Sequence, residues 1–357
     1  MGKFMKLNTA WLVPLALSLL VAGVTNATDT ADPNMIGQQR AHDAGRNLIG
    51  SPAPGLILKT IDGQTIDLNS LYGKKAVYLK FWATWCVPCR QQMPHFQHTF
   101  ENEGADISVI AINVGFNDSV QEIRKYQKQL GITMPIVFDD DGHLSAAFNV
   151  RVTPQHVIIG RDGRIQYVGH LADQQLESAL LAARAPVTDN HSVEARNSTS
   201  GETNRARRLG VGDQIPNTVV RTLDGRRFQF AKQGFEGPTV LVFMSPWCES
   251  YLAATRPTVS ANCRVAREQV AKISRGQQAR WLEVASGLWA SPDDLKEYRD
   301  GYKITLPLTL DESGDLFREF GVSETPTIII LDAKNTVVRR INSGEVATLE
   351  QVLPTLL

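Results

Sequence analysis

The sequence predicts an α/β protein in which one fold occurs twice in tandem behind an N-terminal export signal. Two observations predict this class: apolar strand-like runs alternate with helical segments, and the second half of the chain repeats the landmarks of the first. With 357 residues, the chain is long enough for two domains that each bury a core. Lys and Arg total 37, as do Asp and Glu, so the net charge does not favour nucleic acid as a partner.

Residues 1–27 have the composition of an export signal. Lys3 and Lys6 give a positively charged start, an apolar stretch runs over residues 10–24, and small residues precede Thr28 as at a cleavage site. The apolar stretch is shorter than the about 20 residues of a comfortable membrane span, although an uncleaved N-terminal anchor stays open. We therefore expect a periplasmic, secreted protein in a compartment where disulfides persist.

The internal repeat is visible once Cys248 is aligned with Cys86. Three matches follow without a gap: Gly50 with Gly212, Thr60 with Thr222, and Asp62 with Asp224. After a ten-residue insertion in the second copy the matches resume: Pro135 with Pro307, Asp139 with Asp311, Phe148 with Phe320, and Thr153-Pro154 with Thr325-Pro326. Such order indicates duplication. We expect domains at 46–184 and 209–357, joined by a polar linker at 185–208.

Each copy alternates strands with helices. In the first copy, hydrophobic patterns predict strands at 56–60, 64–68, 76–82, 107–114, 136–138 and 156–159. A helix is expected to begin at Cys86, because Met93 and Phe96 follow at helical spacing, and another over 120–130. This alternation favours an α/β layer with parallel neighbouring strands. Residues 28–45 are polar like the linker, with partial helix as the alternative.

Cys86 and Cys89 stand three residues apart, directly after the buried strand 76–82. In thiol–disulfide exchange the thiolate is the nucleophile, and a helix N-terminus stabilises it through free N–H groups and the helix dipole. Cys89 would lie on the same face one turn on, where it can resolve a mixed disulfide formed by Cys86. Pro88 suits a first helical turn, where its missing N–H costs nothing. The spacing therefore predicts a redox-active pair.

Zinc, haem and a structural bridge are the other uses of such a pair. Zinc needs two more ligands; His95 and His98 are the only candidates on this segment, and His95 would lie about 13 Å along the helix from Cys86. Covalent haem needs His after the second cysteine, where the chain has Arg90. We expect no metal and no cofactor other than the redox-active disulfide Cys86–Cys89, with a purely structural bridge as the remaining alternative.

The run Phe81–Arg90, FWATWCVPCR, resembles the thioredoxin superfamily, and specifically its TlpA/ResA-like extracytoplasmic branch. The resemblance covers about residues 50–183 and extends, with a weaker motif, to the second copy. It implies two tandem thioredoxin-like domains of the three-layer α/β/α class. It also implies that Cys86 attacks, that Cys89 resolves, and that Trp85 shields the pair.

The same resemblance implies that Thr153 and Pro154 form a cis-proline loop facing the dithiol, which presents backbone to an incoming peptide. Two positions depart from the family pattern. Lys80 stands where thioredoxins commonly carry a buried Asp as proton acceptor, and Gln92 stands where many relatives have Glu. Lys80 either points at the site and stabilises a thiolate or is a peripheral strand residue. With both carboxylates missing, water is the expected proton route for Cys89.

In the second copy Tyr251 replaces the resolving cysteine, so a CxxC disulfide cannot form. Cys248 and Cys263, with Pro326 in the repeated proline loop, are a second candidate site. On an unbroken helix the two cysteines would be about 22 Å apart, whereas a disulfide needs Cα atoms within about 7 Å. Pairing therefore requires a break, for which Pro257 is suited. A monothiol that traps clients, a Cys248–Cys263 disulfide and an inert packed Cys248 all stay open.

The resemblance implies an enzyme, an extracytoplasmic thiol:disulfide oxidoreductase that reduces or exchanges disulfides of exported cysteine-containing proteins, apocytochrome c among them. A membrane thiol electron donor would reduce its disulfide again. The sequence does not determine the direction of electron flow. One alternative is a redox-insensitive client-binding or chaperone module that uses the proline-loop surfaces. Another is a thiol peroxidase, since Ser245 lies three residues before Cys248. Against it, the peroxiredoxin pattern also requires Pro at the position of Leu241.

Overall fold

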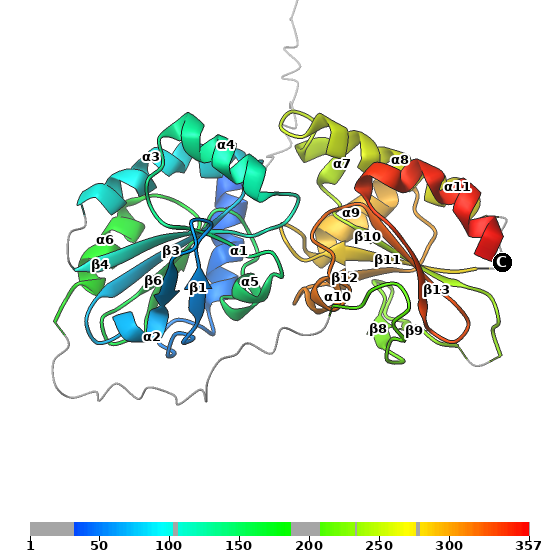
Figure 1. The fold of residues 1–357 in the computed structure, drawn as a ribbon, viewed down its shortest axis with the longest axis horizontal. Coiled ribbons are helices and arrows are strands. Elements are labelled where there is room, and N and C mark those ends of the chain that lie inside the picture. The colour runs from blue at the N-terminus through cyan, green and yellow to red at the C-terminus, as the bar shows by residue number, and fades with distance from the viewer. Residues whose placement is uncertain (1–31, 103–105, 187–207, 233, 276–278, 357) are drawn as a thin grey trace, which may run out of the picture. The chain divides into compact units, whose positions relative to one another are not determined.

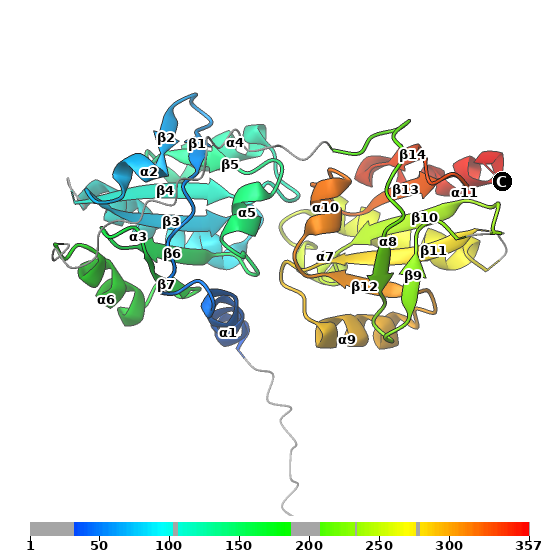
Figure 2. The same cartoon turned by 90° about the horizontal axis from the view of Figure 1, so that it is seen from below.

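A computed structural model describes residues 32–102, 106–186, 208–232, 234–275 and 279–356. The expected export signal at 1–27 lies outside the described residues, as does nearly all of the expected linker at 185–208. Pro33–Leu357 make up one compact unit, which contains two five-stranded sheets flanked by helices (Figures 1 and 2). Within the described ranges, no helix combines the length and the apolar composition that crossing a bilayer requires.

The first half of the chain contains seven strands, five of which form one sheet. Its strands are β1 (Ile57–Lys59), β2 (Thr65–Asp67), β3 (Ala76–Trp82), β4 (Ile107–Asn113), β5 (Ile136–Phe138), β6 (Gln155–Ile159) and β7 (Ile165–Gly169). Its helices are α1 (Pro33–Gly45), α2 (Leu68–Leu71), α3 (Val87–Asn102), α4 (Val120–Leu130), α5 (His143–Ala147) and α6 (Gln174–Ala183). The sheet order is β5-β4-β3-β6-β7, and β1 and β2 form a separate hairpin. All seven residues of the central strand β3 are buried, which suits its unbroken apolar run.

The second half repeats this design. Its strands are β8 (Val219–Arg221), β9 (Arg227–Gln229), β10 (Thr239–Met244), β11 (Arg280–Ser286), β12 (Leu308–Asp311), β13 (Thr327–Leu331) and β14 (Val337–Ile341). Its helices are α7 (Cys248–Tyr251), α8 (Pro257–Ile273), α9 (Pro292–Tyr302), α10 (Asp315–Glu319) and α11 (Leu349–Val352), with 3₁₀ turns at Ser343–Thr348 and Leu353–Leu356. The order β12-β11-β10-β13-β14 matches the first sheet strand for strand. The prediction of one fold occurring twice is confirmed.

The expectation of parallel neighbours is correct for only one side of each sheet. β3, β4 and β5 are parallel, whereas β6 pairs antiparallel with β3, and β7 pairs antiparallel with β6. For β6 and β7 the reason is the short connection between them, in which Gly163 takes a positive φ of 72°. A tight turn of this kind returns the chain beside itself, whereas a parallel pairing needs a long crossover. Each sheet is therefore mixed.

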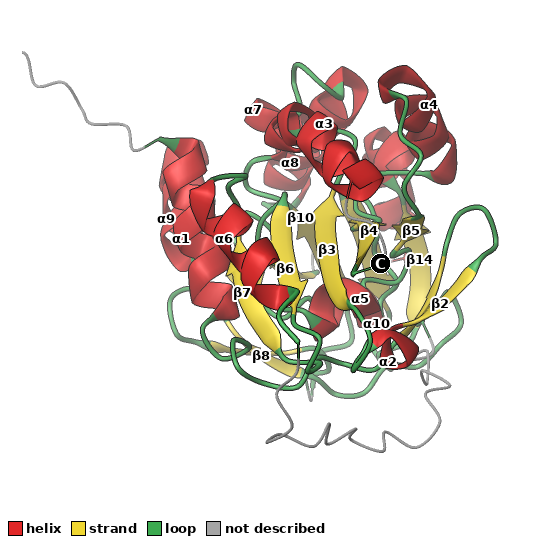
Figure 3. Ribbon diagram, turned by 90° about the vertical axis from the view of Figure 1, so that its left-hand side faces the viewer, coloured by secondary structure: helices red, strands yellow, loops and turns green. Residues whose placement is uncertain are grey.

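The polar segment 28–45 contains a helix at Pro33–Gly45, so its interpretation as linker-like is wrong and the alternative of partial helix is confirmed. Helix α1 packs on the edge strand β7, as Figure 3 shows. Its buried positions are small ones, Gly37, Ala41, Ala44 and Gly45. A Cβ atom on Gly45 would lie 2.5 Å from the Cβ of Val168, so the helix sits too close to β7 for larger residues. Small side chains produce little hydrophobic periodicity, which is why the pattern supported the helix only as an alternative.

Candidate active site

Cys86 lies where the buried strand β3 leads into helix α3. The strand ends at Trp82, and α3 begins at Val87, one residue later than expected. The carbonyl of Cys86 accepts a helical hydrogen bond from the N–H of Arg90 at 3.2 Å. Cys86 is therefore the N-terminal cap of α3, next to the unpaired N–H groups of the first turn.

Cys86 and Cys89 form a disulfide with Cα atoms 5.2 Å apart. The backbone N–H of Cys89 donates to the Sγ of Cys86 over 3.1 Å. One free N–H of the first helical turn thus points at the sulfur that would carry negative charge after reduction, where the helix dipole also favours an anion. Both cysteines are buried, Cys86 at 1% exposure.

The proline loop lies against this disulfide. Thr153 and Pro154 are joined by a cis peptide bond, and the carbonyl oxygen of Thr153 lies 3.2 Å from the Sγ of Cys86. The Nδ1 of His170, which follows β7, donates to the carbonyl of Pro154 at 2.7 Å. The loop is therefore held in place from behind while one of its carbonyls faces the reactive sulfur.

Trp85 lies beside the disulfide and is itself buried. Its Nε1 donates to the carbonyl of Phe116 at 2.7 Å. Two aromatic rings of the second half pack against it, with ring centres at 5.2 Å for Trp247 and 6.2 Å for Tyr251. The hydroxyl of Tyr251 also accepts a hydrogen bond from the N–H of Val87 at 3.1 Å. Within the compact unit, Trp247 and Tyr251 therefore cover the start of α3.

A buried carboxyl group fixes the turn that precedes Cys86. Asp118 accepts from the backbone N–H of Thr84 at 2.7 Å and from the side chain of Asn113 at 2.8 Å. Burial raises the pKa of Asp118, and these hydrogen bonds and Arg256, 3.2 Å away, oppose that rise. Asp118 thus positions the residues before the cysteine pair, a role that its sequence position did not indicate.

Lys80 is completely buried in the middle of β3, so the alternative of a peripheral strand residue is wrong. Within the described part of the chain, its Nζ has no hydrogen-bond partner; it lies 5.3 Å from the centre of the Phe96 ring. Burial lowers the pKa of Lys80 to about 7, so much of the amine is neutral at neutral pH. Because Phe96 belongs to α3, Lys80 faces the helix that carries Cys89.

A chain of buried polar groups connects β3, β6 and α3. His156 lies 2.8 Å from the hydroxyl of Tyr78 and 2.8 Å from Oε1 of Gln92, and Nε2 of Gln92 donates to the carbonyl of His170 at 3.1 Å. An amide oxygen only accepts, so Nε2 of His156 carries the proton and its Nδ1 accepts from Tyr78. Burial, with Lys80 nearby, lowers the pKa of His156 well below its usual range. His156 is therefore neutral.

Sequence reasoning missed both histidines. His156 lies in β6, two residues after Pro154, and His170 directly follows the neighbouring strand β7. A single histidine in an apolar strand carries no signal of its own. The position of His156 two residues after Pro154 is the feature that could have found it. Gln92 was noted only as a departure from a family pattern, whereas its amide joins the two histidines.

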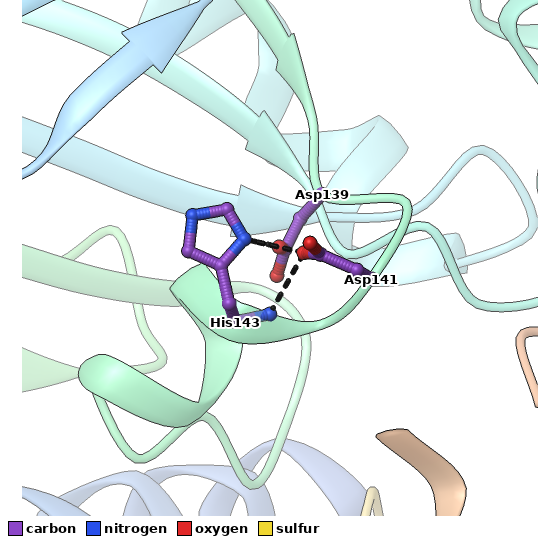
Figure 4. A group of neighbouring side chains, drawn as sticks. All are labelled: Asp139, Asp141 and His143. Carbon is purple, nitrogen blue, oxygen red and sulfur yellow. Dashed lines mark hydrogen bonds and ion pairs between the residues drawn. The ribbon is translucent and has the colours of Figure 1, made fainter. Parts of the chain in front are cut away.

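Asp139, Asp141 and His143 form the one group in the described ranges whose side chains could jointly hold a metal ion (Figure 4). Their hydrogen bonds show another use. Asp139 accepts from the backbone N–H groups of Leu144 and Ser145 at 3.0 and 2.7 Å, and His143 pairs with Asp141. Asp139 thereby satisfies free N–H groups at the start of α5. We interpret the group as a cap and assign no metal to it.

The second half carries its own disulfide, between Cys248 and Cys263, with Cα atoms 6.3 Å apart. Cys248 begins the four-residue helix α7, and Pro257 begins the separate helix α8 that carries Cys263. The chain is therefore broken between the cysteines, as their pairing requires. Both sulfurs are engaged, so the structure has neither the free monothiol nor the unpaired packed cysteine. Pro326 follows a cis peptide bond, like Pro154.

Comparison with known proteins matches residues 49–168 to the AhpC/TSA family. Thioredoxin-like protein YneN of Bacillus subtilis is 33% identical over 175 residues, which are 48% of this chain and 96% of YneN. Thiol-disulfide oxidoreductase ResA of the same organism is 32% identical over 117 residues, which are 32% of this chain and 64% of ResA. Among solved structures, a putative thiol:disulfide interchange protein DsbE from Chlorobium tepidum is 28% identical, with a TM-score of 0.34 over 38% of this chain and 98% of that one.

Proposed function

Because this chain belongs to the thioredoxin-like family of thiol:disulfide oxidoreductases, we propose that it exchanges disulfides with exported cysteine-containing proteins through Cys86 and Cys89. Cys86 is the attacking sulfur and Cys89 the resolving one. Trp85 shields the pair, and the loop at Thr153 and Pro154 receives the client. The redox group is the disulfide itself.

One observation carries this proposal: the Sγ of Cys86 lies between two backbone groups. The N–H of Cys89 is 3.1 Å away and the carbonyl of Thr153 is 3.2 Å away. The N–H group stabilises a thiolate electrostatically. The backbone of Thr153 gives an extended client peptide an edge to pair with, which would place the client's sulfur beside Cys86.

In the reducing direction, the thiolate of Cys86 attacks one sulfur of a client disulfide. A mixed disulfide forms, and the other client sulfur leaves as a thiolate that takes up a proton. Cys89 then loses its proton and attacks the sulfur of Cys86, which closes the Cys86–Cys89 bridge and releases the second client thiol. The client gains two electrons and two protons, and the dithiol of the enzyme loses them.

We place this reaction outside the cytoplasm, on the strength of the export signal expected at residues 1–27. That compartment is oxidising, so a reductant there needs a membrane thiol donor to restore its dithiol. Apocytochrome c is one client whose cysteines must be kept reduced. The reduction potential of the Cys86–Cys89 pair tests the direction: a value near about −270 mV suits a reductant and one near about −120 mV an oxidant.

The experiment that tests the assignment is the reduction of insulin disulfides with dithiothreitol as electron source. Cys86→Ser should abolish the enzyme-dependent rate, because the remaining Cys89 has no partner thiol in the site with which to resolve a mixed disulfide. Gln91→Ala, an exposed change on the same helix, is the matched control and should keep the rate of the unmodified protein. An unchanged rate in Cys86→Ser would refute the assignment and would favour a redox-insensitive binding role.

A further inference from the structure

We propose that the Cys248–Cys263 disulfide is a second redox-active site, which accepts electrons from thiols, and that Glu283 supplies the proton for its reduction. The proposal goes beyond the function assigned to Cys86 and Cys89 and does not depend on it. It rests on the placement of Glu283, a buried side chain that lines the same small cavity as Cys263 and the proline loop residue Pro326.

Glu283 lies in the middle of β11, opposite Val242 of β10, and is 3% exposed. Its Oε2 has no hydrogen-bond partner within the described residues. Burial raises the pKa of Glu283 to about 7, and the charge of Arg267 opposes this only in part. The carboxyl group is therefore held close to half-protonated at neutral pH, as suits a group that both gives and takes a proton.

The other ionisable groups around the cavity do not neutralise Glu283. Arg267 of α8 forms a two-pronged ion pair with Glu249 of α7, with atoms at 2.6 and 3.1 Å. Tyr298 of α9 has its pKa raised by burial and by the negative charges of Glu283 and Glu249, so its hydroxyl stays protonated. Arg267 is already committed to one carboxylate. Glu283 thus faces the cavity as an acid without a strong ionic partner.

Glu283 and Cys263 line the same cavity. It measures about 20 Å³ and is lined by Glu283, Cys263 and Pro326, among others, which is enough for about one water molecule. A water molecule in this cavity would relay a proton between Glu283 and Cys263. A purely structural bridge between α7 and α8 gains nothing from an unpaired acid beside it, because an apolar side chain would fill the space without desolvating a polar group.

Each half of the chain carries one buried ionisable side chain in the corresponding pair of neighbouring strands. In the first sheet Lys80 of β3 lies opposite Ala111 of β4, and in the second Val242 of β10 lies opposite Glu283 of β11. Each central pair of strands thus buries one ionisable group, a base in the first half and an acid in the second. The second disulfide therefore has its own proton source and does not need the first site.

The reaction balances as a thiol–disulfide exchange. A thiolate attacks the sulfur of Cys248, the Cys248–Cys263 bond breaks, and Cys263 leaves as a thiolate that takes the proton of the Glu283 carboxyl group. A second donor thiolate then attacks the donor sulfur of this mixed disulfide. It releases Cys248, which takes a proton from solvent, and the two donor thiols leave joined as a disulfide. Two electrons pass from the donors to the protein, and Glu283 regains its proton from water.

Reduction of the folded full-length protein by excess dithiothreitol tests this. The state of each cysteine is read by alkylation and peptide mass spectrometry, in the unmodified protein and in a Cys86→Ser, Cys89→Ser double variant. We expect Cys248–Cys263 to be reduced in both proteins while the fold persists. If the bridge stays closed until denaturant is added, it is structural and the proposal fails. Loss of insulin reduction in the double variant would concern only the first site.

Glu283→Gln tests the proton step. Below about pH 7, where Glu283 is protonated, we expect the variant to be reduced roughly 100-fold more slowly, the lower end of what a positioned acid contributes. The difference should shrink as the pH rises above 7, because the acid is then lost in the unmodified protein too. Glu350→Gln, which removes an exposed carboxylate paired with Lys272, should change nothing. Equal rates for Glu283→Gln and the unmodified protein at every pH would overturn the role of Glu283.

Discussion

The Sγ of Cys86 lies 3.2 Å from the carbonyl oxygen of Thr153, although 67 residues separate them in the chain. β3 and β6 pair antiparallel in the middle of the sheet, so the end of β3 and the start of β6 meet at one edge. Cys86 follows the end of β3, and Thr153 precedes the start of β6. The fold therefore brings together the sulfur that we propose as the attacking one and the backbone that we propose binds the client.

The buried amine of Lys80 predicts an unusual dependence of stability on pH. Its pKa in the folded protein is about 7, below its ordinary value of 10.5. Between these pH values the unfolded chain therefore binds more protons than the folded protein. The contribution of Lys80 to the free energy of unfolding consequently rises with pH through this window, by up to about 1.4 kcal/mol per pH unit. Below about pH 7 its destabilising effect is fully present.

Lys80→Met should therefore be more stable than the unmodified protein at pH 7, and the gap should narrow toward pH 10. Urea unfolding of both proteins across that range measures it, and comparing the two cancels the other titrating groups. Lys75→Met, at a position before β3 that is not buried, is the control and should show no such change in the gap. A gap that is independent of pH would mean that Lys80 is charged in the folded state.

Gln92 predicts a stability effect from the polar chain around His156. Gln92→Ala leaves the Nε2–H of His156 buried without its acceptor, which should cost about 1–3 kcal/mol of unfolding free energy. Urea unfolding measures the loss. Gln91→Ala, on the exposed side of α3, is the matched control and should stay within about 0.5 kcal/mol of the unmodified protein. Equal stability of the two variants would show that the hydrogen bond contributes nothing.

Tyr251 predicts that the second half restrains access to Cys86. Its hydroxyl accepts from the N–H of Val87 at 3.1 Å, so Tyr251→Phe removes about 1 kcal/mol from the contact. In the reduced protein we expect Cys86 to be alkylated by iodoacetamide about fivefold faster. Tyr302→Phe, at an exposed ring in α9, should leave the rate unchanged. If both variants match the unmodified protein, the contact does not limit access.

Much of the framework follows from the sequence, because its signals are local. Helix α4 spans Val120–Leu130 as predicted, since Ser119 caps its start and Gly131, at φ 64°, ends it. The positions of Cys86 and Cys89 were equally predictable from the sequence, because a buried strand that leads into a helix leaves a strong pattern. In these places the local sequence and the fold agree.

What the sequence did not reveal depends on contacts between distant segments. A lysine is almost never fully buried, so the sequence left two positions open for Lys80, at the site or at the periphery, although the strand that carries it was predicted to be buried. The partner of Cys248 depended on how the chain runs between α7 and α8, and the proline at 257 indicated only that a break was available. The bonds of His156 to Tyr78 and Gln92 join three elements of the fold, and no spacing in the sequence predicts them.

The most direct test of the central claim is to trap the mixed disulfide. Reduced Cys89→Ser is mixed with a peptide disulfide, and the adduct is located by peptide mass spectrometry. We predict that the peptide is attached to Cys86 and stays there, because the resolving thiol is gone, while the protein with Cys89 intact releases it. Attachment of the peptide only to cysteines other than Cys86, or no adduct at all, would contradict the assignment of Cys86 as the attacking sulfur.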